Sequence, residues 1–209
     1  MSPILVTVTG GIGTGKTTVV RSFQNDNEIR TIEESIDKWK MIHSTNLLEE
    51  CTKYNRRCME FQLQILNNVN RLFFEEYGKA TEKQIILTDR GNEDPHKIFI
   101  PAMLKSNRID IVQAEILTES STFMSQQLLP KYYIYLKSSP QKCMERICKR
   151  GRYEENEIER SYIEMLCSLY ENWLLPLDNS FCIDVDNLSI KQVYAECKQI
   201  LDEIKYIEN

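Results

Sequence analysis

Residues 10–17, with the sequence GGIGTGKT, are the part of this chain whose types and spacing are best suited to chemistry. They satisfy the pattern G-x-x-x-x-G-K-[ST], in which backbone N–H groups surround the phosphates of a nucleoside triphosphate. A β-branched run at 4–8 precedes the loop and residues 17–20 can begin a helix, an order that disfavours the alternative of a glycine-rich hairpin. Lys16 would reach the outer phosphates and the Thr17 hydroxyl would contact Mg²⁺. The sequence therefore predicts an ATP and Mg²⁺ site at Gly10, Gly11, Ile12, Gly13, Thr14, Gly15, Lys16, Thr17 and Thr18.

Further charged residues follow the other predicted strands. Glu34 comes after a run at 28–32, and a carboxylate there can accept a hydroxyl proton; a solvated loop acid is the alternative. Asp89 and Arg90 come after a run at 84–88, where the acid can reach Mg²⁺ and the arginine can hold a phosphate; a structural ion pair is the alternative. Asp184, Val185 and Asp186 end the last run and are predicted to contact ATP.

A cluster of positive charge surrounds Gly151. It comprises Arg146, Lys149, Arg150 and Arg152, and two glutamates follow it. The planar guanidinium can hold phosphate oxygens, and a glycine beside such a cluster is typical of a flap that closes over them, although charge runs are more often solvated helix faces. We predict a lid at about 146–156 with Arg150 and Arg152 on the phosphates.

Strands alternating with helices must position these groups. Further strands are predicted at 132–136 and 181–185, and helices at 61–77, from 140 to about 149, and from 190 onward, the last two opened by serine caps. This order predicts an α/β fold with a parallel sheet covered by helices on both faces. Ligands of such sheets lie beyond the strand C-termini, where the marked residues converge. One domain over residues 1–209 is expected.

The composition of the chain disfavours some classes of partner and location. The 209 residues carry a net charge of −5, which makes an extended nucleic-acid backbone an unfavourable partner. No run approaches the ~20 apolar residues that cross a bilayer, and the start of the chain carries no leader pattern. The seven cysteines are scattered without paired C-x-x-C spacing, which favours reduced thiols and a cytoplasmic location.

Together these motifs resemble the deoxynucleoside kinase family, which includes the animal deoxycytidine, deoxyguanosine and mitochondrial thymidine kinases and related insect and viral enzymes. ESIDKW at 34–39 resembles the family's E-P-V-x-x-W, and DRG at 89–91 stands at its E-R-S. NLL at 46–48, FQ at 61–62 and the arginine-rich segment at 145–155 also match. The resemblance implies a P-loop kinase fold with a five-stranded parallel sheet, and phosphorylation of a deoxynucleoside 5′-hydroxyl by ATP.

The resemblance also implies roles. Glu34 is the base for the 5′-hydroxyl, Arg90 holds the 5′ end and Asp89 acts near Mg²⁺ with Thr17. Catalysis is assigned to Glu34, Arg90 and Lys16. The substrate site comprises Glu34, Trp39, Tyr54, Gln62, Ile65, Val69, Arg90, Pro95, Phe99, Arg152 and Glu155, with Gln62 at the base edge, Phe99 stacked on the base and Glu155 at the 3′-hydroxyl.

The chain departs from the family pattern at several positions. Ser35 replaces proline, Asp89 replaces the longer glutamate, and Cys148 stands where a lid arginine is common. The family's tyrosine for the 3′-hydroxyl has no direct counterpart, and Tyr54 lies two or three positions late.

The base preference rests on two positions. Purine-accepting relatives carry an Arg and an Asp where this chain has Val69 and Pro95, which favours a pyrimidine deoxynucleoside, thymidine or deoxycytidine. If the alignment with these relatives shifted by one residue, Asn68 and Asp94 would stand at the two positions instead. The resemblance further implies a homodimer through helices near 61–77 and 108–127.

Two alternatives stay open. A nucleoside monophosphate kinase of the thymidylate kinase kind shares the glycine loop, a D-R motif and an arginine lid, but it needs no hydroxyl base at Glu34. The other is a nucleotide-binding protein without catalysis, which the full set of phosphotransfer groups disfavours.

Overall fold

The structure, a computed structural model, describes residues 3–34, 36–81, 84–126 and 131–208. Within them five parallel strands form one sheet in the order β2-β5-β1-β6-β7. These strands are β1 (Ile4–Thr9), β2 (Ile29–Ile32), β5 (Ile85–Asp89), β6 (Tyr132–Lys137) and β7 (Ser180–Asp184). The predicted α/β fold with a five-stranded parallel sheet is confirmed, and each predicted strand end lies within about one residue of the observed one.

The central strands are apolar because both faces of the sheet are covered. All residues of β1 and β5 are buried, and β1 pairs with β5 from Ile4 opposite Ile85 to Val8 opposite Asp89. Such continuous burial is typical of parallel sheets between helical layers. The register brings the ends of β1 and β5 to the same edge of the sheet.

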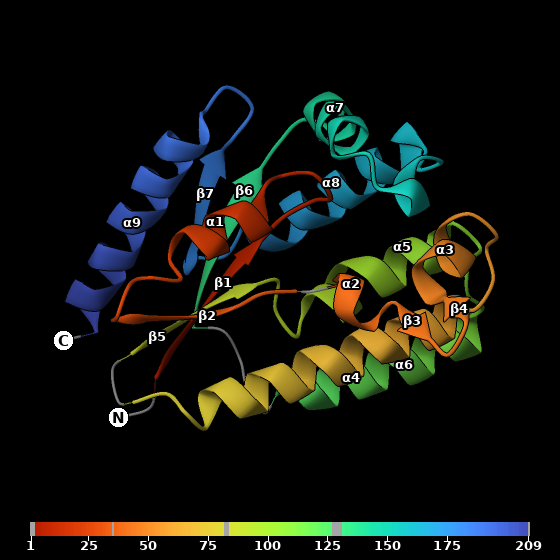
Figure 1. Ribbon diagram of the computed structural model, residues 1–209, viewed down its shortest axis with the longest axis horizontal. Coiled ribbons are helices and arrows are strands. Elements are labelled where there is room, and N and C mark those ends of the chain that lie inside the picture. The colour runs from red at the N-terminus through yellow and green to blue at the C-terminus, as the bar shows by residue number, and fades with distance from the viewer. Residues whose placement is uncertain (1–2, 35, 82–83, 127–130, 209) are drawn as a thin grey trace.

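Helices cover both faces (Figure 1). On one face, α1 (Lys16–Ser22) and α9 (Ile190–Ile207) pack on β1, β6 and β7 through a cluster that includes Val19, Phe23 and Leu201. On the other, α7 (Pro140–Arg150) and α8 (Arg160–Leu174) pack on β6, and α4 (Cys58–Tyr77) packs on β5. The predicted serine caps are present at Ser139 and Ser189.

A helical region extends beyond the carboxyl edge of the sheet. It contains α2 (Ile36–Trp39), α3 (Leu47–Thr52), α5 (Ile100–Lys105), α6 (Ile111–Ser125) and the short hairpin of β3 (Met41–Ile42) and β4 (Thr45–Asn46). A single π-helical turn, η1 (Pro95–Phe99), leads into α5. Figure 1 shows α4 and α6 side by side along the lower side of the molecule, where their apolar residues join those of α3 and α5 in one cluster.

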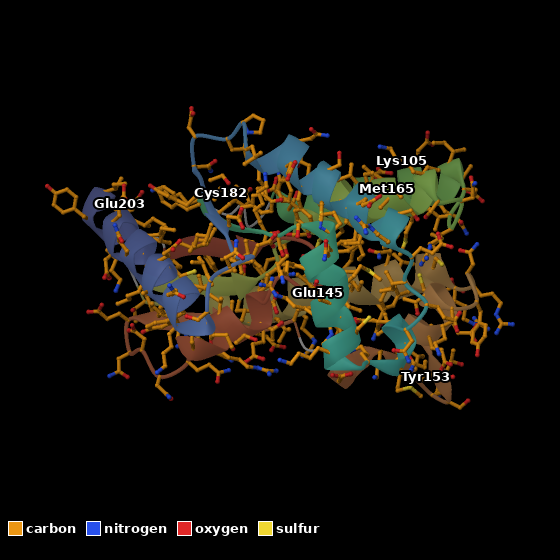
Figure 2. All side chains as sticks on the ribbon, turned by 90° about the horizontal axis from the view of Figure 1, so that it is seen from above. Lys105, Glu145, Tyr153, Met165, Cys182 and Glu203 are labelled. Atoms are coloured by element: carbon orange, nitrogen blue, oxygen red, sulfur yellow. The ribbon has the colours of Figure 1, made fainter. Side chains whose placement is uncertain are left out.

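The lid follows α7. Gly151 takes a left-handed conformation with φ 66°, which ends the helix and turns the chain into η2 (Tyr153–Glu155). Figure 2 shows the ribbon passing from α7, where Glu145 is labelled, to the lid, where Tyr153 is labelled near the edge of the molecule. The buried Glu154 carboxylate accepts hydrogen bonds from Lys40 Nζ and Asn46 Nδ2, both at 2.7 Å. These bonds connect η2 to Lys40, which directly precedes β3, and to Asn46, which ends β4 and caps α3.

Two further predictions concern membranes and thiols. Over the residues that the structure describes, no helix is both long and apolar enough to cross a bilayer. All seven cysteines fall within that described part, and each is a free thiol.

Candidate active site

A cavity of about 900 Å³ opens where β1, β2 and β5 end. The glycine loop, the segment after β2 and the turn after β5 contribute to one end, together with α7, the segment after β7 and the start of α9. The helical region, α4 and the start of α8 form the rest. Most of the predicted site residues line it. They are Ile12, Gly13, Thr14, Gly15, Lys16, Thr17, Thr18, Glu34, Gln62, Ile65, Val69, Arg90, Pro95, Phe99, Arg150, Arg152, Glu155 and Val185.

The glycine loop is shaped by close backbone approach. Gly13 has φ 87°, and a Cβ there would lie 2.8 Å from the Cys143 carbonyl oxygen. Only glycine therefore fits this position without displacing α7. The loop ends at Lys16, the first residue of α1, so free N–H groups and the positive end of the helix face the cavity.

Lys16 is almost fully buried beside the loop. Its Nζ donates a hydrogen bond to the Gly11 carbonyl oxygen at 2.7 Å. Burial, followed by the nearby Arg90 charge, lowers the pKa of Lys16 to about 8. An ammonium in this place is poorly compensated, and an anionic phosphate would stabilise its charged form.

Thr17 and Asp89 form the predicted metal position. The Thr17 hydroxyl donates to Asp89 Oδ2, while the second carboxylate oxygen, Oδ1, is buried and has no hydrogen-bond partner among the described residues. Asp89 Oδ1 accepts no hydrogen bond from the described residues and lies on the same carboxylate that the Thr17 hydroxyl contacts. These oxygen atoms are ligands that suit a hard cation such as Mg²⁺. The residues present therefore fit the metal.

Glu34 and Arg90 form a buried ion pair at the junction of the two halves of the cavity. Their side chains are 7% and 13% exposed. Burial raises the pKa of Glu34, and the charge of Asp89 adds to this, although Arg90 acts in the opposite direction. Burial opposes the charge of Arg90, but Glu34 and the neighbouring acids outweigh it, so the pKa of Arg90 rises. The guanidinium lies 5.0 Å from the centroid of the Phe99 ring.

Gln62 marks the base end of the cavity. It is 1% exposed, and both Nε2 and Oε1 are buried without a hydrogen-bond partner among the described residues. An amide with a free donor and a free acceptor in one plane is costly unless a ligand satisfies both. Pro95 and Phe99, placed by the π-helical turn, line the same region. This arrangement fits a flat, polar-edged ring.

The lid arginines are paired in this structure. Arg152 Nη1 lies 2.8 Å from Glu155 Oε1, and Arg150 contacts the other oxygen of the same carboxylate. Arg152 also lies 3.6 Å from the exposed Asp37. Phosphates entering the cavity would compete for these guanidinium groups.

Some predicted residues lie elsewhere. Tyr54 is 51% exposed, its hydroxyl faces Glu49, and it does not line the cavity, because it follows the end of α3 on the outer surface. The structure therefore gives no support to a contact between Tyr54 and the sugar, and that assignment stays a prediction. Asp184 is exposed and Asp186 accepts hydrogen bonds from Ser138 and the backbone of Ser139, so of the segment 184–186 only Val185 lines the cavity.

The remaining predicted residues are two glycines of the loop and one tryptophan. Gly10 and Gly11 shape the loop without lining the cavity themselves. The side chain of Trp39 lies outside the described residues, although its backbone ends α2. Ser35, the departure from the family's proline, also falls outside the described residues.

The sequence patterns missed several lining residues. Arg146 and Lys149 belong to the basic cluster around Gly151 and also line the cavity, although only Arg150 and Arg152 are assigned to the phosphates. Leu48 belongs to the NLL match at 46–48, which assigns it no role. Other lining residues carried no sequence signal, because they come from the inner faces of helices and from the loops beside them. They include Cys51, Thr52, Met103, Arg108, Ile158 and Tyr162.

The chain resembles known proteins in sequence along most of its length. The sequence model of the deoxynucleoside kinase family matches residues 6–207. The chain is similar to human mitochondrial thymidine kinase 2, with 24% identity over 173 residues that cover 82% of this chain and 64% of the human protein. Chicken deoxycytidine kinase 2 is 28% identical over 207 residues, covering 88% of this chain and 77% of that protein. Xenopus laevis mitochondrial deoxyguanosine kinase is 23% identical over 193 residues, covering 81% and 72%.

The chain thus spans less than two thirds of the human relative's length. Its relatives are named for three different bases, so their names alone do not select one. Because the family pattern extends over residues 6–207, the chain belongs to the deoxynucleoside kinase family.

Proposed function

We propose that this protein transfers the terminal phosphoryl group of ATP to the 5′-hydroxyl of a deoxynucleoside. The observation that carries the proposal is that Lys16 of the phosphate loop and the buried carboxylate of Glu34 line one continuous cavity. A triphosphate held by the loop can therefore face an alcohol held by Glu34.

The chain's own groups divide the work. Glu34 accepts the proton of the 5′-hydroxyl as the phosphoryl group moves, and Arg90 holds the sugar end of the substrate and keeps Glu34 in place. Lys16, Arg150 and Arg152 stabilise the charge that develops on the phosphate oxygens. Mg²⁺, held by Thr17 and Asp89, would neutralise charge on the phosphates.

We also propose a pyrimidine deoxynucleoside, thymidine or deoxycytidine, as the acceptor. Val69 and Pro95 line the cavity, whereas Asn68 lies outside the lining and donates to the Gln64 carbonyl at 2.8 Å. Asp94 does line the cavity, but its carboxylate oxygens accept hydrogen bonds from within the protein. Neither Asn68 nor Asp94 is therefore available as the polar pair that a purine would need, which supports the alignment that favours a pyrimidine.

The alternatives are less well supported. A monophosphate acceptor would bring phosphate charge beside Glu34, where a carboxylate repels it. A binding protein without catalysis would have no use for a buried Glu34–Arg90 pair at the junction of the two halves of the cavity.

A homodimer, a cytoplasmic location, one domain over residues 1–209 and the absence of a nucleic-acid partner remain predictions. The dimer is supported by apolar side chains on α6 that are about half exposed, such as Val112 at 59% and Phe123 at 62%. The outward face of α6 and Phe74 of α4 would form its interface.

An assay of ATP-dependent transfer tests the function. The purified chain is offered thymidine, deoxycytidine, deoxyguanosine, deoxyadenosine and thymidine monophosphate side by side. We expect nucleoside monophosphate products, formed fastest from a pyrimidine. Faster transfer to deoxyguanosine would overturn the base assignment, and transfer to thymidine monophosphate alone would overturn the acceptor.

A further inference from the structure

The turn after β5 holds Arg90 in an unusual conformation. Arg90 has φ 64°, in the left-handed region that non-glycine residues adopt at a cost in free energy. Its backbone N–H still donates to the Val8 carbonyl at 2.9 Å, so the main chain remains tied to β1. The left-handed turn directs the side chain to Glu34. Something in the surroundings must offset the cost of this conformation.

Asp94 makes the bonds that do so. It is 1% exposed, and its Oδ2 accepts a hydrogen bond from the backbone N–H of Gly91, the residue after Arg90, at 2.9 Å. Its Oδ1 accepts from Thr9 Oγ1 at 2.6 Å and from Tyr170 Oη at 2.7 Å. One carboxylate thus joins the end of β1, the turn that carries Arg90, and α8.

We propose that Asp94 is a positioning residue for catalysis, which locks the left-handed turn of Arg90 and fixes it relative to the phosphate loop. The inference rests on the proposed function and adds a residue to it. Thr9 ends β1 immediately before the glycine loop, so the Thr9–Asp94–Gly91 bonds set the spacing between the phosphate-binding and hydroxyl-binding groups. Tyr170, which is fully buried, braces the same carboxylate from α8.

The charge of Asp94 acts on the same site. Glu34 faces Arg90 and Asp89 from the end of β5, Lys16 from α1 and Asp94 from the start of η1. Burial is the main cause of the raised pKa of Glu34; the negative charge of Asp94 raises it further, by less than the neighbouring charge of Asp89 does. Removing that charge would therefore let Glu34 ionise at lower pH, an effect separate from any loss of geometry.

Two variants separate geometry from charge. Asp94→Asn keeps the size of the side chain, removes its charge and turns one acceptor into a donor. Tyr170→Phe removes the hydrogen bond to Asp94 and the interaction of the same hydroxyl with Arg90, and it leaves the charge of Asp94 in place. Tyr135→Phe is the matched control, because Tyr135 is 2% exposed and stacks on Tyr170 with centroids 6.1 Å apart, yet its hydroxyl has no bond to Asp94.

We expect Asp94→Asn to lower kcat by about 100-fold and Tyr170→Phe by about 10-fold, since small displacements of catalytic groups have effects of this size. KM for ATP changes by less than about 3-fold, because the glycine loop remains folded. The acidic limb of the kcat/KM profile for the nucleoside moves to lower pH in Asp94→Asn and does not move to lower pH in Tyr170→Phe. Tyr135→Phe retains wild-type rates.

Rates are expressed per folded protein, with the melting temperature measured for each variant. If Asp94→Asn folds and keeps its kcat within about 3-fold of the wild type, the positioning role is wrong, whether or not its acidic limb moves. If Asp94→Asn fails to fold, Tyr170→Phe decides, and a kcat equal to that of Tyr135→Phe overturns the inference. A wild-type protein that phosphorylates no deoxynucleoside would instead overturn the proposed function.

Discussion

At the scale of single residues, the electrostatics of the cavity depend on a small buried group of charges. Glu34 and Asp89 face Lys16 and Arg90 in a region with little solvent. Burial raises the pKa of the Glu34 carboxyl and lowers that of the Lys16 ammonium, so these two groups are closer to their neutral forms than they would be in water. A base of raised pKa is better suited to accept a proton near neutral pH.

Glu34→Gln tests the base directly. The amide keeps the size of the side chain but cannot accept the hydroxyl proton, so we expect kcat to fall about 100-fold or more while KM for ATP changes little. Glu33→Gln is the control, because Glu33 is bonded to Arg21 and Gln24 on the surface side. Equal turnover in the two variants would remove the base assignment.

The same two pKa shifts predict a bell-shaped pH profile. Glu34 must be ionised, and because its pKa is raised, kcat/KM falls on acidification at a higher pH than an ordinary glutamate would give. Lys16 must be charged, and because its pKa is lowered to about 8, kcat/KM for ATP falls as pH rises through that value. Steady-state rates from pH 5 to 10 measure both limbs. A profile flat up to pH 10 would contradict the role of Lys16.

Some residues of the site could be predicted because their chemistry is written in local patterns. Lys16 and Thr17 stand at fixed places in a motif, and Glu34 and Arg90 follow buried strands. The position of Tyr54 could not be predicted, because the sequence does not show whether a residue just after α3 faces the cavity or the solvent. In the structure Tyr54 is exposed. Asp94 and Tyr170 lie 76 positions apart, so no local pattern could show that they meet.

At the scale of elements, the strand ends position the site. Continuous apolar runs predicted where the strands lie, because a parallel sheet covered on both faces needs apolar residues along the whole of its central strands. The π-helical turn at Pro95–Phe99 was not foreseen, since its formation depends on packing against α6 and α8. It brings Pro95 and Phe99 to the cavity wall.

The glycine loop makes a paired prediction possible. Gly13→Ala would place a Cβ 2.8 Å from the Cys143 carbonyl, whereas Gly15→Ala meets no atom within 4 Å and suffers only from its φ of 98°. We expect Gly13→Ala to weaken ATP binding by more than 100-fold and Gly15→Ala by about 10-fold, the strain of one left-handed residue being about 1–2 kcal/mol. Titration calorimetry with a non-hydrolysable ATP analogue measures both. A stronger effect at Gly15 would contradict the loop geometry.

At the scale of the whole molecule, α4 and α6 present an outer face that the rest of the described chain leaves uncovered (Figure 1). Val112, Ile116 and Phe123 on α6 are between 46% and 62% exposed, and Phe74 on α4 is 51% exposed. Apolar side chains grouped in this way favour association.

A double charge substitution tests the dimer. Ile116→Glu with Phe123→Glu would place charge in the proposed interface, so we expect the mass in solution to fall from two chains to one. Tyr206→Glu is the control, since Tyr206 is 85% exposed on the distant α9. Light scattering during size-exclusion chromatography gives the masses. A wild-type monomer, or a double variant that stays dimeric, would contradict this interface.

The sheet and the glycine loop could be predicted from the sequence, whereas the helical region beyond the sheet and the base end of the cavity could not. The phosphate end is built from segments next to strand ends, and each has a local signature. The base end is assembled from α3, α4, α5, α8 and the connection between α5 and α6. Thr52, Arg108 and Tyr162 reach it only through the tertiary packing of these elements. Substrate preference therefore depends on residues that tertiary packing brings together.

A crystal structure with thymidine and a non-hydrolysable ATP analogue measures the central geometry. The account predicts that the nucleoside 5′-oxygen lies about 2.6–3.2 Å from a Glu34 carboxylate oxygen, with the terminal phosphate between Lys16 and that oxygen. A nucleoside bound with its 5′-oxygen out of reach of Glu34, or a triphosphate whose end points away from it, would contradict the account.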